Sequence, residues 1–250
     1  MIKSINRIFV LTIRNIKEII RDPISLIFII GLPLVMEIVF YLIFSKLTSQ
    51  FQMQYLAPGI VVFSQAFLTL FIGTLISLDR NTSFLTRLFV TNAKPYEFIF
   101  SYIFSIIPLV LVQTILFFVI GGIFDFSIVK IEMIYCILLS IITSLLFLGF
   151  GVLIGSICNE KSVGGVASII ISAQSILSGM WFPVEDLNGS FINVMNYLPF
   201  KNATILLQNV LNGINDLYID FIKPLVIVLI YIIVIYIIAI NAYNYKMKNR

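Results

Sequence analysis

The chain has 250 residues, of which 60% are hydrophobic and 11% charged, and its formal net charge is +4. Soluble domains have roughly 45–50% apolar and about 25% charged residues, so the composition excludes a soluble globule and predicts an all-α membrane protein. The sequence contains no histidine and no GxxxxGK[ST] phosphate-binding motif. We therefore expect no metal site, no bound cofactor and no enzymatic activity in this chain, and nothing in it indicates nucleic-acid binding.

Residues 1–22 predict an amphipathic helix that lies in the membrane interface. At about 100° per residue the basic side chains share one narrow arc and most isoleucines share another. The basic residues are Lys3, Arg7, Arg14, Lys17 and Arg21. A simple orientation anchor is the alternative use of this segment. We expect the helix to lead into the first span at Asp22-Pro23, because proline is tolerated in the first turn of a helix.

Six later stretches are long and apolar enough to cross a membrane, which takes about 20 residues. They cover residues 23–44, 57–78, 98–122, 133–158, 163–182 and 224–243. Most of the 16 lysines and arginines lie before the first span, after the second and fourth, and in the C-terminal tail. Basic residues near spans are retained in the cytoplasm, which sets the orientation of the chain. The composition, rich in isoleucine, asparagine and lysine, is typical of bacteria. We expect a multi-pass bacterial cell-membrane protein with both termini cytoplasmic.

A short polar segment at 79–95, DRNTSFLTRLFVTNAKP, separates the second and third spans. It predicts an amphipathic helix with one apolar face and two arginines beside it. The apolar face holds Phe84, Leu85, Leu88 and Phe89, and the arginines are Arg80 and Arg87. Such a helix is suited to contact a partner outside the membrane.

Two motifs carry a family resemblance. Residues 79–91 resemble the pattern that follows the second span of ABC-2 type permeases, the membrane subunits of a class of ABC exporters. The matching residues are Asp79, Arg80, Leu85, Arg87, Leu88 and Thr91, whereas Ser83, Phe84 and Asn92 differ from the usual residues. Residues 177–200, with SGMWFP and LPF, are similar to the family's exit from the fifth span and its later proline. The resemblance covers essentially the whole chain.

This resemblance implies an ATP-driven exporter. Two permease copies or paralogues would form the pathway between them, and separate ABC ATP-binding subunits would hold ATP-Mg and hydrolyse it. The 79–95 segment would be a cytoplasmic coupling helix in a cleft of each ATPase. Its coupling residues would be Asp79, Arg80, Phe84, Leu85, Arg87, Leu88, Phe89 and Thr91. The cargo would be amphipathic drugs, peptides or lipid-linked compounds, as in multidrug efflux.

Polar residues inside the spans are the pathway candidates, because charge facing lipid is costly. They are Glu37, Gln65, Gln113 and Gln174. Glu37 could meet a cationic cargo or gate the pathway, or it could be hydrogen-bonded to one of the three glutamines. Residues 183–223 hold short apolar patches, and we expect an external re-entrant loop of short helices that caps the pathway.

Two other classes of protein stay open. A secondary transporter would need internal repeats or clustered intramembrane ionisable groups. A non-transporting membrane subunit for immunity or sensing would keep the helices but would need no contact with an ATPase.

Overall fold

The computed structural model describes residues 2–81, 95–181 and 189–248, and all the regular secondary structure in these ranges is helical. The first half holds α1 (Ile2–Ile20), α2 (Pro23–Leu26), η1 (Ile27–Gly31), α3 (Leu32–Phe44), η2 (Ser49–Phe51), α4 (Met53–Asn81) and α6 (Pro95–Phe124). The second half holds η3 (Phe126–Ile128), α7 (Glu132–Ile157), α8 (Glu160–Leu177), α9 (Gly189–Tyr197), α10 (Pro199–Asn212), η5 (Leu217–Ile222) and α11 (Lys223–Lys248). The prediction of an all-α fold is confirmed.

Within the described residues, five helical stretches are long and apolar enough to cross a membrane. They are Pro23–Phe44, Met53–Arg80, Tyr96–Phe124, Glu132–Ile157 and Leu217–Tyr243. The fifth predicted span, residues 163–182, corresponds to α8 (Glu160–Leu177), which has 18 residues and would be about 27 Å long at 1.5 Å per residue. It is not one of the five, because Glu160 and Lys161 at its start, four serines and Gln174 lower the mean hydropathy of the helix. A crossing by α8 therefore remains a prediction.

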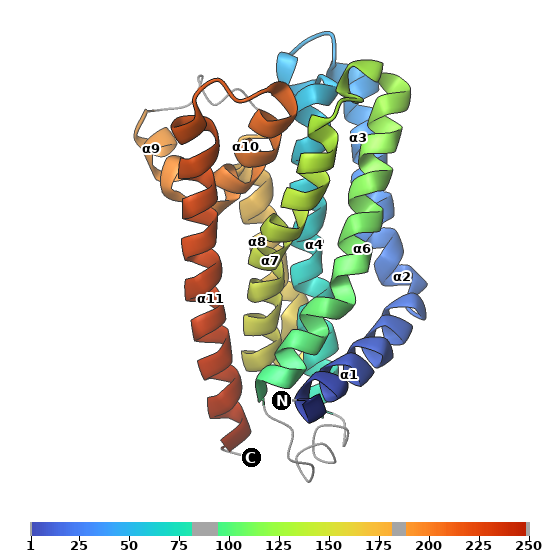
Figure 1. Ribbon diagram of the computed structural model, residues 1–250, viewed down its shortest axis with the longest axis vertical. Helices are drawn as coiled ribbons and strands as arrows, with labels where there is room; N and C mark the ends of the chain where they lie inside the picture. The colour runs from blue at the N-terminus through green and yellow to red at the C-terminus, as the bar shows by residue number, and fades with distance from the viewer. Residues whose placement is uncertain (1, 82–94, 182–188, 249–250) are drawn as a thin grey trace.

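The long helices form a bundle around α4 (Figure 1). α4 packs against α3, α6, α7, α8 and α10, and it is the most buried of the five candidate spans. Both termini lie at one end of the bundle, whereas α9 and α10 lie toward the other end (Figure 1). This arrangement agrees with the prediction that both termini are on the same side of the membrane. Below we refer to these as the terminal end and the opposite end.

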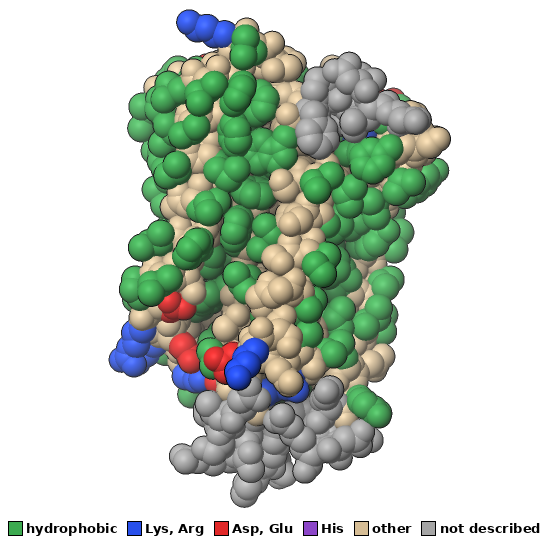
Figure 2. All heavy atoms as spheres, turned by 180° about the vertical axis from the view of Figure 1, so that it is seen from behind, with side chains coloured by type: hydrophobic (Ala, Val, Ile, Leu, Met, Phe, Trp, Pro, Cys, Tyr) green, Lys and Arg blue, Asp and Glu red, His purple; other side chains and the backbone are tan. Residues whose placement is uncertain are grey.

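The sides of the bundle are apolar and its charges gather mainly at the terminal end (Figure 2). Large hydrophobic side chains stand outward on several spans, for example Phe28 at 52%, Leu138 at 57% and Ile233 at 59% exposure. An apolar surface of this extent is unsuited to water but suited to a bilayer. The protein is therefore a multi-pass membrane protein.

Glycines allow α7 to approach its neighbours closely. A Cβ on Gly155 would lie 2.8 Å from the Gly73 carbonyl oxygen of α4, and one on Gly149 would lie 2.9 Å from Ile235 of α11. Gly164 and Gly165 of α8 have nothing within 4 Å of such an atom. Small residues promote close helix contacts inside membranes. In this bundle the glycines of α7 make such contacts, and Gly164 and Gly165 of α8 do not.

The segment before the last long helix folds against the bundle as short helices. Most of α10 is buried, and it packs on α4, α7 and α11. Gln208 and Asn212 donate hydrogen bonds to the carbonyl oxygens of Tyr55 (2.9 Å) and Gln54 (3.1 Å) at the start of α4. The expected short helices are present, and their depth in the membrane stays a prediction.

Candidate functional site

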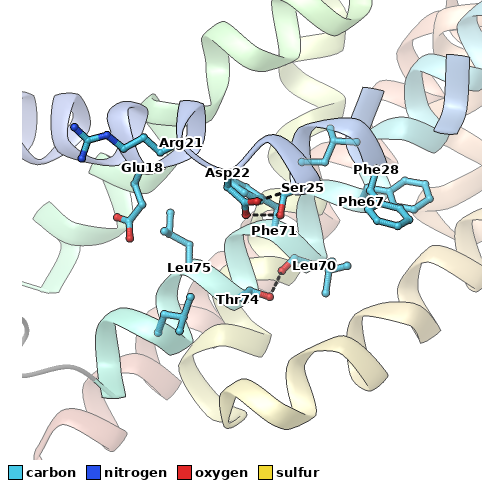
Figure 3. A pocket seen from close by; sticks show the side chains of 12 residues that line it. Glu18, Arg21, Asp22, Ser25, Phe28, Phe67, Leu70, Phe71, Thr74 and Leu75 are labelled. Atoms are coloured by element: carbon cyan, nitrogen blue, oxygen red, sulfur yellow. Dashed lines mark hydrogen bonds between the residues drawn. The ribbon is translucent and has the colours of Figure 1, made fainter. Parts of the chain in front are cut away.

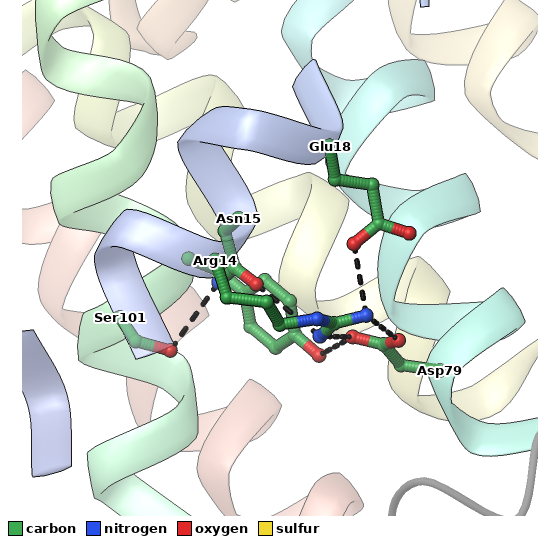
Figure 4. A network of polar contacts seen from close by, with 6 residues as sticks. Arg14, Asn15, Glu18, Asp79 and Ser101 are labelled. Atoms are coloured by element: carbon green, nitrogen blue, oxygen red, sulfur yellow. Dashed lines mark hydrogen bonds and ion pairs between the residues drawn. The ribbon is translucent and has the colours of Figure 1, made fainter. Parts of the chain in front are cut away.

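A partly buried ion pair joins α1 to the end of α4. The guanidinium of Arg14 donates two hydrogen bonds to the carboxylate of Asp79, each 2.6 Å long (Figure 4). The hydroxyl of Tyr102 on α6 donates a third, also 2.6 Å, to Oδ2 of Asp79. Asp79 is only 3% exposed, so these bonds satisfy a carboxylate that water barely reaches. A fork-to-fork pair of this kind fixes geometry as well as charge.

Neighbouring residues of α1 extend this contact. Glu18, one turn after Arg14, lies 2.8 Å from its Nη2 atom, and Asn15 donates a 3.4 Å hydrogen bond to the hydroxyl of Ser101 (Figure 4). Burial acts to lower the pKa of Arg14, but the hydrogen bonds and charge of Asp79 outweigh it and raise that pKa above its ordinary value. Burial also raises the pKa of Glu18, although the charge of Arg14 opposes the change. The guanidinium therefore stays charged at any physiological pH.

A second ion pair joins α1 to the start of α6. Arg7 lies two turns before Arg14 on the same face of α1, and its Nη2 atom is 3.2 Å from Oε1 of Glu97. The hydroxyl of Ser4 donates to the same oxygen. The side chain of Glu97 is 1% exposed. An acidic residue in the first turn of a helix is also favoured by the helix dipole.

Arg80 makes a third connection, this time to the turn between α7 and α8. Its Nη1 atom donates to the carbonyl oxygens of Gly155 at 2.6 Å and Cys158 at 3.3 Å. These carbonyls belong to the last turn of α7, where backbone acceptors lack helical partners. The same residue thus caps α7 and ties it to α4.

Together these side chains hold the two helix ends that flank residues 82–94. Asp79 and Arg80 come just before that segment and Glu97 comes just after it. We refer to Arg7, Arg14, Asp79, Arg80 and Glu97 as the root clamp. It joins the end of α4 and the start of α6, which flank residues 82–94, to α1 and to the α7–α8 turn.

Comparison with known protein families decides what kind of bundle this is. Residues 6–211, which include most of α1 and all of the root clamp and extend through most of α10, match the family model described as ABC-2 type transporter. The chain belongs to the ABC-2 type transporter family. It is a permease subunit of an ABC-type transporter, and the family's membrane domain has no ATPase domain of its own. A comparison with curated proteins found no match.

The permease's predicted coupling residues divide into two groups. Asp79 and Arg80 are buried at 3% and 7% exposure, so they contact the permease's own helices and present no free surface to a partner. The other six lie outside the described residues: Phe84, Leu85, Arg87, Leu88, Phe89 and Thr91. A coupling role for all eight remains a prediction. Asp79 and Arg80 would act through the permease helices that they contact, and not by touching the partner.

Reasoning from the sequence missed Arg7, Arg14, Glu97 and Tyr102 as parts of this site. A usable signal was present, because Arg7 and Arg14 are seven residues apart and therefore share one face of α1. Asp79 and Glu97 are the acidic residues nearest the two ends of the polar segment on the same side of the membrane. Complementary charges at one membrane surface favour pairing.

The permease's four pathway candidates are all fully buried inside the chain. Glu37 on α3 lies against Gly121 of α6, where a Cβ on Gly121 would be 3.3 Å from its Oε1 atom. Neither carboxylate oxygen of Glu37 has a hydrogen-bond partner among the described residues. The suggested bond to Gln65, Gln113 or Gln174 is therefore not found.

Two of the three glutamines form hydrogen bonds with neighbouring helices and not with Glu37. Gln65 donates to the carbonyl oxygen of Ser140 on α7 (2.9 Å), and Gln174 donates to the hydroxyl of Thr204 on α10 (3.1 Å). In the described part of the chain the side-chain amide of Gln113 has no hydrogen-bond partner. The structure does not gather the four residues into one polar site, and their role in a pathway stays a prediction.

Proposed function

We propose that this permease works in an ATP-driven exporter in which residues 82–94 dock on a separate ATP-binding subunit. The observation that carries the proposal is the root clamp, which ties both ends of that segment to the membrane helices through buried charge. ATP-Mg would bind on the partner subunit. Both permease termini, at the same end of the bundle, would be cytoplasmic in a bacterial cell membrane.

The clamp supports a mechanical role for the docking segment. A partner that moves residues 82–94 pulls on Asp79, which carries α1 with it through Arg14, and on Glu97, which carries α1 through Arg7. The same motion acts on the α7–α8 turn through Arg80. Breaking these contacts would leave buried charges uncompensated, so the helices are expected to move as one unit.

The pathway would lie between two permeases, as copies or paralogues. In the described conformation Glu37, Gln65, Gln113 and Gln174 are enclosed within one chain, so cargo could meet them only after the helices separate. An apolar interior of this kind suits amphipathic drugs, peptides or lipid-linked compounds, because charged cargo would be costly to move through it.

The test is co-purification of the permease with the ATP-binding subunit encoded beside it, followed by measurement of ATP turnover. We expect Arg87→Glu and Leu88→Asp to lower the yield of complex or its permease-dependent turnover at least tenfold. Lys130→Glu is the matched control, because it reverses an exposed charge at the opposite end and should leave both readouts unchanged. Circular dichroism and gel filtration of each variant check that the bundle is intact.

The result that would overturn the proposal is a wild-type permease that captures no ATP-binding subunit. Equal turnover of the wild type and both variants in an intact complex would reject residues 82–94 as the docking segment. The non-transporting alternative would then account better for the chain.

A further inference from the structure

A cavity of about 450 Å³ lies between the first helices of the chain and α4 (Figure 3). Its walls come from the end of α1, from α2 and η1, and from one side of α4. This volume is within the range of sites that hold small organic ligands. None of the root clamp residues lines it.

The cavity is apolar at one end and polar at the other. Phe28 and Phe67 lie together at the apolar end, with Phe71 and Leu75 between them and α1 (Figure 3). Glu18 and Arg21 lie at the polar end, where α1 passes (Figure 3). Because α1 belongs at the membrane surface, the polar end would face the headgroup region and the apolar end the hydrocarbon. This polarity matches that of an amphiphile.

The charges at the polar end are not equivalent. Asp22 accepts hydrogen bonds from the backbone N–H (3.2 Å) and the hydroxyl (2.5 Å) of Ser25, and thereby caps α2. Glu18 pairs with Arg14 at 2.8 Å. The exposed guanidinium of Arg21 has no ion pair or hydrogen bond with any residue that the structure describes. Of the charged groups that line the cavity in the described part of the chain, the guanidinium of Arg21 is therefore the one without an ion-pair or hydrogen-bond partner.

We propose that this cavity binds an anionic phospholipid of the leaflet at the terminal end, with its phosphate at Arg21 and an acyl chain against Phe28 and Phe67. A guanidinium matches the geometry of a phosphate, which it can bind through two hydrogen bonds. The apolar half of the cavity would hold the acyl chain of the same lipid, and basic residues at the membrane surface attract anionic headgroups. Lipid binding at this site does not require the ATP-binding subunit, so the proposal can be tested separately from the proposed function.

The test measures the thermal stability of the purified permease in an uncharged detergent. Phosphatidylglycerol should raise the unfolding temperature more than phosphatidylcholine does, and inorganic phosphate should have no comparable effect because it has no acyl chain. Arg21→Gln should weaken the apparent affinity for phosphatidylglycerol about fivefold, since one basic residue near an anionic headgroup contributes about that factor. Lys17→Gln is the control, because Lys17 lies one turn earlier on α1 and does not line the cavity.

A second variant narrows the cavity from the α4 side. Leu78→Trp adds bulk from a partly exposed wall position and should weaken the effect of both phospholipids while leaving the stability without lipid unchanged.

Three outcomes would overturn the proposal. The first is equal stabilisation of wild type, Arg21→Gln and Leu78→Trp by phosphatidylglycerol. The second is the same effect from inorganic phosphate alone, which would assign a free-anion site. The third is a changed oligomeric state of Arg21→Gln or Leu78→Trp in native mass spectra, which would assign the cavity to a contact between permease copies.

Discussion

Replacing Asp79 with asparagine should lower the free energy of unfolding of the permease by about 3 kcal/mol. The carboxylate holds both Nη atoms of Arg14 and the hydroxyl of Tyr102, and its side chain is 4% exposed. Asparagine has one acceptor oxygen and no charge, so the guanidinium loses its counter-ion. The Arg14 side chain is 32% exposed, which places the expected cost at the low end for a buried pair.

Unfolding of the purified permease, followed by circular dichroism in mixed micelles, measures this cost. Glu18→Gln is the matched control, because it removes the other carboxylate beside Arg14. The Glu18 side chain is 41% exposed, so its loss should cost less than about 1 kcal/mol. In the double variant Arg14→Gln/Asp79→Asn the two losses should not add, since the residues share one interaction. Additive losses would show that the two side chains do not form the pair described.

Replacing Gly155 with alanine should destabilise the permease by about 2 to 3 kcal/mol. The new Cβ would meet the Gly73 carbonyl oxygen at 2.8 Å and the Gly73 Cα at 3.1 Å, both of which are backbone atoms. No side-chain rotation can relieve that contact, so α7 and α4 must move apart. The separation would also shift the carbonyl of Gly155 that Arg80 holds.

The same unfolding measurement applies, with Gly165→Ala as the control. A Cβ on Gly165 meets nothing within 4 Å, and alanine is the better helix former, so this variant should be neutral or more stable by up to about 1 kcal/mol. Equal stability of Gly155→Ala and the wild type would contradict the close packing of α4 and α7.

Much of the fold follows from long apolar runs, because a run of about 20 apolar residues in a membrane protein has few structures available other than a helix. The entry into the first span at Asp22-Pro23 is likewise as predicted, since Asp22 caps α2 and Pro23 occupies its first turn. α8 differs from the other spans, because polar side chains dilute its apolar sequence. Local sequence cannot decide whether such a helix crosses the membrane, since its neighbours determine that.

The functional site was only partly predictable, because it depends on contacts between distant residues. The sequence motif predicts that Asp79 and Arg80 touch a partner, whereas the structure buries both against α1 and the α7–α8 turn. An amphipathic helix in isolation suggests that its basic face is turned to water. Arg7 and Arg14 instead face the bundle, and apolar residues such as Phe9 and Ile20 are exposed at 64% and 67%. Only the acidic partners on α4 and α6 explain that orientation.

ATP turnover by the complex of permease and ATP-binding subunit, compared between wild type and Asp79→Asn, tests the clamp most directly. Gly149→Ala is the destabilised control, because its new Cβ meets Ile235 and Tyr236 of α11, away from the clamp. The assay temperature is kept below unfolding for all three proteins. We predict an assembled Asp79→Asn complex whose permease-dependent turnover falls at least tenfold, while Gly149→Ala retains it. Unchanged turnover of an intact Asp79→Asn complex would contradict transmission through the root clamp.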